Sequence, residues 1–325
     1  MKKVLLTAVL VLFVVLAACG DERSDKEVVA DAFDNMMNAE SYESSSTVDF
    51  ELSGNMNDPM FDQVTSMLND FELQVDQAYD QEAQMQEVVM DISGSIPPLS
   101  LDVKLPFLQD LENQVMYMRT DSLADNLGMM FPIPEEAKGK LVKMDLQNMQ
   151  GVEGEDMPEM DQEEMQERGQ AIFKDFIEQK DEGDFTQEED RYSVSITQED
   201  FRYLMEAFME EFDEMFTQEE MDTFNQDLDT MMKEMDEVLT VEQFDMSMVI
   251  EDDQIQENTL ESDLLFEDPE SDESMQFYMN VQTTYSNRNG DIEFNIDPEN
   301  EETISFEELN QMMNDMMMQD MGGMN

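Results

Sequence analysis

The fold is decided by the stretch Tyr42-Glu43-Ser44-Ser45-Ser46-Thr47-Val48-Asp49-Phe50-Glu51-Leu52, whose side chains alternate between two chemical kinds. The apolar set, at a period of two residues, is Tyr42, Val48, Phe50 and Leu52. The polar set between them is Glu43, Thr47, Asp49 and Glu51. Because successive side chains of a strand point to opposite faces, this period predicts a long strand with one buried face and one face in water.

Alternation of the same kind returns along most of the chain after this first strand. It is found in the ranges 71–79, 88–92, 99–105, 192–196, 244–250, 260–266, 275–285 and 292–296. Asn289-Gly290, which separates the last two ranges, is a typical two-residue hairpin turn. Residues 115–119 look like another strand that alternates less cleanly, and a short strand is expected around 142–146. Helix and strand patterns do not alternate one for one, so a parallel α/β sheet is not expected. We predict an α+β fold with about nine or ten antiparallel strands, each with one apolar face.

Apolar residues at helical spacing form stripes in several segments. The predicted helices cover 25–39, 159–179, 199–215, 218–235 and 305–319. Ser24 with Glu27, and Ser305 with Glu308, have the spacing of capping boxes at the first and last of these helices. A shorter helical excursion is expected within 60–69.

The helical stripes and the turn signals together suggest the domain organisation. The acidic segment 151–161, which contains glycine and proline, reads as a linker. We expect one domain over 25–320, with a helical insertion at about 159–235 and a disordered tail at 321–325.

The N-terminus has the pattern of a secretory signal. Lys2 and Lys3 precede a mainly apolar run, residues 4–18, which is shorter than the roughly 20 residues that cross a bilayer. Leu16-Ala17-Ala18-Cys19, followed by a polar stretch, resembles the lipobox of bacterial lipoproteins. In that family the cysteine sulfur carries a diacylglycerol and the signal is cut before it. We therefore expect a signal peptide at 1–18, lipidation of Cys19 and an acidic tether at 19–24. The alternative is an ordinary signal peptide in which Cys19 has no special role.

Composition excludes several classes of function. The chain has 81 acidic against 16 basic residues and a formal net charge of −65, which excludes nucleic acid as a partner. It has no histidine and one cysteine, so catalytic triads that use histidine, histidine metal sites and an intramolecular disulfide are excluded as well. Hydrophobic residues make up 40% of the chain and occur in clear periods, which argues against disorder. We interpret the acidic excess as the exterior of a halophile or alkaliphile protein.

The order of lipobox, short acidic tether, amphipathic helix and long antiparallel strands resembles lipoproteins of Bacillus-like bacteria and, through them, the LolA/LppX lipoprotein-carrier superfamily. The resemblance implies a strongly curved sheet, a half-barrel, with helices in its concave face over an apolar cavity. No motif matches position by position, so no ligand-binding residue is carried over.

The expected function follows from the anchor and this resemblance. We expect a lipid-anchored protein on the extracytoplasmic face of the cell membrane that is not an enzyme and needs no cofactor. It would be a monomer that binds a hydrophobic or lipid-like ligand, or a partner in the envelope. The alternative is a solute-binding lipoprotein of an ABC importer, although that class would have alternating strand and helix units.

One segment resembles a calcium loop of the EF-hand kind. Asp297, Glu299, Glu301 and Glu308 stand at positions one, three, five and twelve of such a loop. However, Glu302 replaces the glycine needed at the sharp turn, and a predicted strand precedes the loop where the motif requires a helix. We therefore expect a loop that leads into a capped helix, and no metal site.

Methionine is unusually frequent, with 35 residues, several of them close to the C-terminus. Clustered thioethers can bind copper(I). The methionines also fill predicted helix stripes and strand faces, where they would act as flexible core residues. A third use is an adaptable lining for an apolar ligand.

The lipobox generates a direct test of the anchor. We expect the wild-type protein, expressed in a host that processes lipoproteins, to fractionate with membranes. Cys19→Ala should move it to the soluble fraction, because the sulfur that carries the lipid is gone. Wild-type protein recovered in the soluble fraction without bound lipid would show that Cys19 is not an anchor.

Overall fold

A computed structural model describes most of the chain. The described residues are 23–56, 60–96, 99–127, 133–146, 162–211, 238–267, 271 and 273–322. Cys19, the linker at 151–161 and the helix predicted at 218–235 lie outside these ranges.

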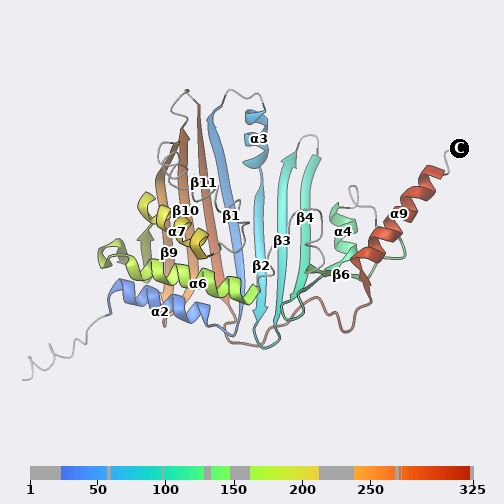
Figure 1. The fold of residues 1–325 in the computed structure, drawn as a ribbon, viewed down its shortest axis with the longest axis horizontal. Coiled ribbons are helices and arrows are strands. Elements are labelled where there is room, and N and C mark those ends of the chain that lie inside the picture. Colours follow the sequence, from blue (N-terminus) through green and yellow to red (C-terminus); the bar gives the residue numbers. More distant parts are fainter. Residues whose placement is uncertain are drawn as a thin grey trace, which may run out of the picture.

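A twelve-stranded sheet forms the centre of the structure, in the order β12-β6-β5-β4-β3-β2-β1-β11-β10-β9-β8-β7 (Figure 1). The strands are β1 (Ser41–Asn55), β2 (Glu72–Asp80), β3 (Met85–Ile96), β4 (Leu99–Asp110), β5 (Val115–Arg119), β6 (Leu141–Asp145), β7 (Phe185–Glu188), β8 (Arg191–Ser195), β9 (Leu239–Glu251), β10 (Gln254–Glu267), β11 (Ser274–Ser286) and β12 (Thr303–Ser305). Neighbours are antiparallel except β12 and β6, which are parallel. The α+β class and the mainly antiparallel sheet are therefore confirmed.

Strand β1 joins the two halves of the sheet. It pairs with β2 on one side and with β11 on the other, and Val48 stands opposite both Leu73 and Val281. Opposed residues of antiparallel strands point to the same face, so the apolar positions of neighbouring strands line up across the sheet. We call the side that carries Val48 and Phe50 the apolar face. The side that carries Asp49 and Glu51 is the acidic face.

The helices are α2 (Asp25–Met37), α3 (Phe61–Leu68), α4 (Thr120–Leu127), α6 (Gln162–Gln179), α7 (Gln198–Glu211) and α9 (Phe306–Gly322). Ser24 and Glu27 form the predicted capping box of α2, with reciprocal side-chain bonds to backbone N–H groups. The excursion expected within 60–69 is helix α3.

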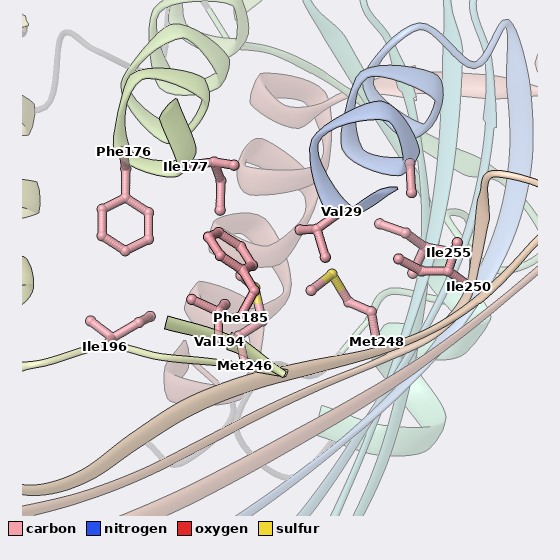
Figure 2. Close-up of a cluster of buried hydrophobic side chains, with 11 residues drawn as sticks. Val29, Phe176, Ile177, Phe185, Val194, Ile196, Met246, Met248, Ile250 and Ile255 are labelled. Atoms are coloured by element: carbon pink, nitrogen blue, oxygen red, sulfur yellow. The ribbon is translucent and has the colours of Figure 1, made fainter. Parts of the chain in front are cut away.

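Helices α2, α6 and α7 lie on the β7–β10 side of the sheet, and in the view of Figure 1 α6 continues in front of the lower parts of β11 and β1. Val29 of α2 points towards Met248 of β9, and Phe176 and Ile177 of α6 point towards Ile196 and Phe185, which belong to the same buried cluster as Met246 of β9 (Figure 2). Because Met246 lies opposite Leu260 of β10, which in turn lies opposite Val281, this contact is on the apolar face. Full burial of such a side chain contributes about 1.5–3 kcal/mol.

A buried cation fastens α6 to α7. Lys180, only 7% exposed, places Nζ 2.8 Å from Oδ2 of Asp200 and 3.4 Å from Oδ2 of Asp184. Burial alone would raise the pKa of Asp200, but hydrogen bonds from Lys180 and Thr197 outweigh it and hold the pKa below its ordinary value. The backbone carbonyl of Lys180 accepts a bond of 2.6 Å from Lys26, which ties α2 to the same point.

Helices α4 and α9 pack on the apolar face at the opposite end of the sheet. A second buried cluster there joins Val142 and Met144 of β6 and Ile304 of β12 to Leu309 of α9. Leu123 of α4 packs against the same cluster. The far part of α9 extends beyond the sheet (Figure 1).

The hairpin predicted at Asn289-Gly290 is wrong, and residues 292–296 form no strand. The backbone N–H of Asn289 donates instead to the carbonyl of Ser41, and its side-chain oxygen accepts the N–H of Glu40. Ser41 also donates its hydroxyl to the carbonyl of Gly290. The turn is thus bonded to the start of β1, and the following chain leaves β11 instead of folding back on it.

Residues 291–302 cross the acidic face towards β12. We call this segment the strap. Ile296, 1% exposed, packs against Leu108 and Leu141 from the acidic-face side of β4 and β6. The buried carboxylate of Glu87 accepts hydrogen bonds from the backbone N–H groups of Asn295 and Ile296 and from the Asn295 side chain, at 2.6–2.9 Å. These donors would otherwise need a partner strand.

Four further elements were not predicted: β7, α4, β12 and the short 3-10 helix Glu182–Asp184. Each is short, between three and eight residues, and has too few positions to establish a period. The segment expected to be a helical insertion at about 159–235 contains the β7–β8 hairpin as well as helices. This hairpin forms one edge of the main sheet.

Glu87 provides a stability test for the strap. Glu87→Gln places amide hydrogens against the strap's N–H donors, so we expect the free energy of unfolding to fall by about 2 kcal/mol. Denaturant unfolding in high salt measures this loss of stability. Glu51→Gln is the control, because Glu51 is exposed on β1 and lies on the same acidic face of the sheet as Glu87. Equal losses in both variants would mean that Glu87 does not hold the strap.

Candidate ligand surface on the apolar face

Burial of the apolar face varies from its ends to its middle. Fully buried apolar side chains gather under α2 and α6 at one end and under α4 and α9 at the other. The central strands carry apolar side chains that are only half-buried: Val48 and Phe50 on β1, Leu73 and Val75 on β2, Val88, Met90 and Ile92 on β3, and Phe277, Met279 and Val281 on β11. We call these ten residues the central apolar surface.

The central apolar surface has well-defined margins. Asn69, just after α3, bonds the backbone N–H and carbonyl of Leu52 at 2.7 and 2.9 Å, and Leu52 is buried. Asn126 of α4 bonds the N–H and carbonyl of Lys104 in the same way, next to buried Val103. In both places a side-chain amide occupies backbone groups of a strand that would otherwise face solvent.

A row of aromatic side chains borders this surface near the start of β1. The rings of Tyr79 and Tyr42 lie 5.4 Å apart, those of Tyr42 and Tyr285 lie 6.2 Å apart, and the guanidinium of Arg288 lies 5.2 Å from the Tyr285 ring. Burial raises the pKa of Tyr42 to about 12, and the neighbouring Tyr285 and Tyr79 add smaller increases. A hydrogen bond from Gln77 acts in the opposite direction and lowers it. The rings of this row meet at tilted and edge-on angles, and burial also raises the pKa of Tyr285.

Several polar groups interrupt the apolar face. Ser46 and Thr283 share a hydrogen bond of 2.9 Å between their hydroxyls. On β10, the hydroxyl of Ser262, a residue 2% exposed, and Oδ1 of Asn258 have no hydrogen-bond partner in the described part of the chain. Unpaired buried polar atoms are rare and require an explanation, such as a bound water or ligand group. The apolar face is therefore interrupted on β10 by polar atoms that are shielded from solvent.

The four calcium-loop candidates are not brought together. Glu301 accepts hydrogen bonds from Arg119, which lower the pKa of Glu301, and Asp297 accepts a hydrogen bond from Asn300 that lowers its own pKa. Glu308 caps α9 through Ser305, as predicted. Glu299 is exposed. Within the described residues, no group of three or more acidic, histidine or cysteine side chains could hold a metal ion.

The C-terminal methionines divide between two environments. Met312 and Met313 pack against the cluster under α9, whereas Met318 is 69% exposed. Core filling therefore accounts for part of the C-terminal group. On the sheet, Met90 and Met279 belong to the central apolar surface, where an unbranched thioether can adapt to the shape of a ligand.

Sequence reasoning identified most of the apolar strand positions but missed the tyrosine row and the unpaired polar atoms. The tyrosines lie at 42, 79 and 285, and only the strand register shows that they are neighbours. Ser262 and Asn258 interrupt an otherwise apolar pattern, which is the signal that could have marked them.

Comparison of the sequence with models of known protein families finds no match, and comparison with curated protein sequences finds none either. Within the described ranges, no helix has both the length and the apolar character needed to cross a membrane.

The raised pKa of Tyr42 predicts how stability depends on pH. Its pKa in the folded state, about 12, exceeds the unfolded value of about 10. The protonated Tyr42 hydroxyl therefore contributes its full share to the free energy of unfolding below pH 10, and this contribution is lost as the pH rises towards 12. We expect Tyr42→Phe to abolish this dependence of the unfolding free energy on pH. When the formation of tyrosinate is followed by ultraviolet absorbance, the same variant should lack the tyrosine that ionises at the highest pH. Tyr278→Phe, on the acidic face, is the control, and an unchanged titration in Tyr42→Phe would contradict the assignment.

Proposed function

We propose that this protein is a lipoprotein anchored through Cys19 to the extracytoplasmic face of the cell membrane, where it binds a hydrophobic or lipid-like ligand without catalysing a reaction. The lipobox supports the anchor, and the central apolar surface supports the ligand. A tethered protein also has lipids within reach.

One observation carries the ligand proposal: the change in burial along the apolar face. A sheet with one wet face must bury the other against itself, against helices or against a ligand. Here the described helices bury the two ends, and the central strands keep their apolar side chains half-buried. Each Å² of this surface that a ligand removes from water contributes about 25 cal/mol.

The finer arrangement is part of the same proposal. We propose that the sheet is a half-barrel, that its concave side is the apolar face, and that the helices lie within that concavity. The resemblance to the LolA/LppX superfamily motivates this arrangement, and the packing of α2, α6, α4 and α9 on a single face supports it. The alternative, a solute-binding lipoprotein of an ABC importer, is not favoured, because the described sheet is antiparallel apart from β6 and β12.

A pair of neighbouring positions on β1 tests the ligand surface. The chain contains no tryptophan, so a single introduced indole reports without background. We expect fluorescence of Val48→Trp, on the apolar face, to be quenched saturably by a neutral monoacylglycerol brominated in mid-chain, because bromine quenches indole only at short range. Thr47→Trp, exposed on the acidic face of the same strand, should not be quenched.

Two outcomes would contradict this proposal. One is equal quenching of Val48→Trp and Thr47→Trp, which would indicate adsorption without a site. The other is the absence of both saturable quenching and co-purified lipid, measured by organic extraction and mass spectrometry of protein purified in high salt.

A further inference from the structure

A groove of about 420 Å³ lies between helices α2 and α6, away from the central apolar surface. Its lining comes from these two helices and from Asn38, which directly follows α2, and includes no strand residue. The volume falls within the range of about 300–1,000 Å³ that is typical of small-molecule sites.

Apolar side chains form the body of the groove. Phe33 of α2 and Phe173 of α6 pack with tilted rings whose centroids lie 4.5 Å apart, and Ile177 also lines the groove. Ala30 and Ala171 line the groove from opposite helices, where their small side chains leave room. An aliphatic chain laid here would contact aromatic and methyl groups, and it would not have to displace a strand.

The charged groups of the groove are unevenly balanced. Asp34 and Glu178 supply two carboxylates, and Lys174 supplies one ammonium. Nζ of Lys174 lies 3.3 and 3.4 Å from the two carboxylate oxygens of Asp34, and both side chains are more than half exposed. These distances exceed the 2.7–2.9 Å of a good charge-assisted bond. The pair is therefore weak, and another cation could take the place of Lys174.

We infer that the groove binds a cationic amphiphile: an aliphatic chain that lies on Phe33 and Phe173 and ends in an ammonium group at Asp34 and Glu178. Charge complementarity selects this ligand class. The chain has a net charge of −65, so its field concentrates cations at the surface and repels carboxylates and phosphates of similar chain length. The site is separate from the surface proposed above and does not depend on it.

A head-group series tests the inference on the full protein in dilute buffer. Dodecyltrimethylammonium, dodecanoate and dodecyl maltoside share one chain length and differ in charge, and each is titrated below its micelle concentration by calorimetry. We expect saturable one-site binding for the ammonium compound, weaker binding for the neutral one and the weakest for the carboxylate. Lys174→Gln should tighten ammonium binding, and Asp34→Asn should weaken it, by about two- to fivefold each, the range that exposed ion pairs support.

Matched variants separate the groove from general attraction to an acidic surface. Ala171→Trp fills the groove and should abolish binding, whereas Gly169→Trp, on the same helix with open space around it, should not. Asp175→Asn removes an exposed charge of α6 outside the groove and should leave binding unchanged. Equal affinity for the three head groups, or full binding by Ala171→Trp, would overturn the inference. Neither result would affect quenching of Val48→Trp, so the two proposals fail independently.

Discussion

The structure depends on one constraint: a single sheet that places nearly all of its apolar strand residues on the same side. Strand β1 sets this constraint, because its alternation is matched on both flanks, by β2 and by β11. Within the described residues, the helices bury the apolar face of this twelve-stranded sheet only in part. The described helices accordingly sit at the two ends and at the tips of hairpins, and the middle strands stay half-buried. The candidate ligand surface is thus a consequence of the way in which the sheet is built, and not a feature added to a finished core.

The few basic residues are concentrated where elements meet. Arg119 of β5 bonds Glu301 at the end of the strap, Lys180 joins α6 to α7, and Arg23 ahead of α2 bonds Asp253 in the β9–β10 turn. With 81 acidic residues available, any cation finds a partner easily, so the position of the cation decides which junction is fastened. Each exposed ion pair contributes little to the free energy of unfolding. Lys180 differs, because it is buried and loss of either carboxylate partner would weaken the compensation of its charge.

Local periodicity was enough to predict the long strands and the helices, because a two-residue or 3.6-residue period reports directly on which side faces the core. The features that local periodicity could not predict are set by hydrogen bonds between residues far apart in the chain. Asn289-Gly290 has the chemistry of a hairpin turn, yet its bonds to Ser41 and Glu40 send the chain across the acidic face to Glu87. The calcium-loop pattern failed for a related reason, since Glu301 is bonded to Arg119, a residue far away in the chain. The apolar positions of the central strands follow from the two-residue period, but the tyrosine border depends on strand register, which composition does not encode.

The two outermost strands of the sheet, β7 and β12, are only four and three residues long. Exposed strand edges are templates on which a second chain can pair, and edge-to-edge growth is a common route to aggregation. A polyanion in dilute buffer is protected from this route by repulsion between copies, but at about 1 M salt the Debye length falls to about 3 Å and that protection disappears. The protection that short edge strands give does not depend on ionic strength. They offer an incoming chain few free backbone groups in brine as in dilute solution, so the protein keeps a safeguard against self-association under the conditions in which its charge no longer provides one.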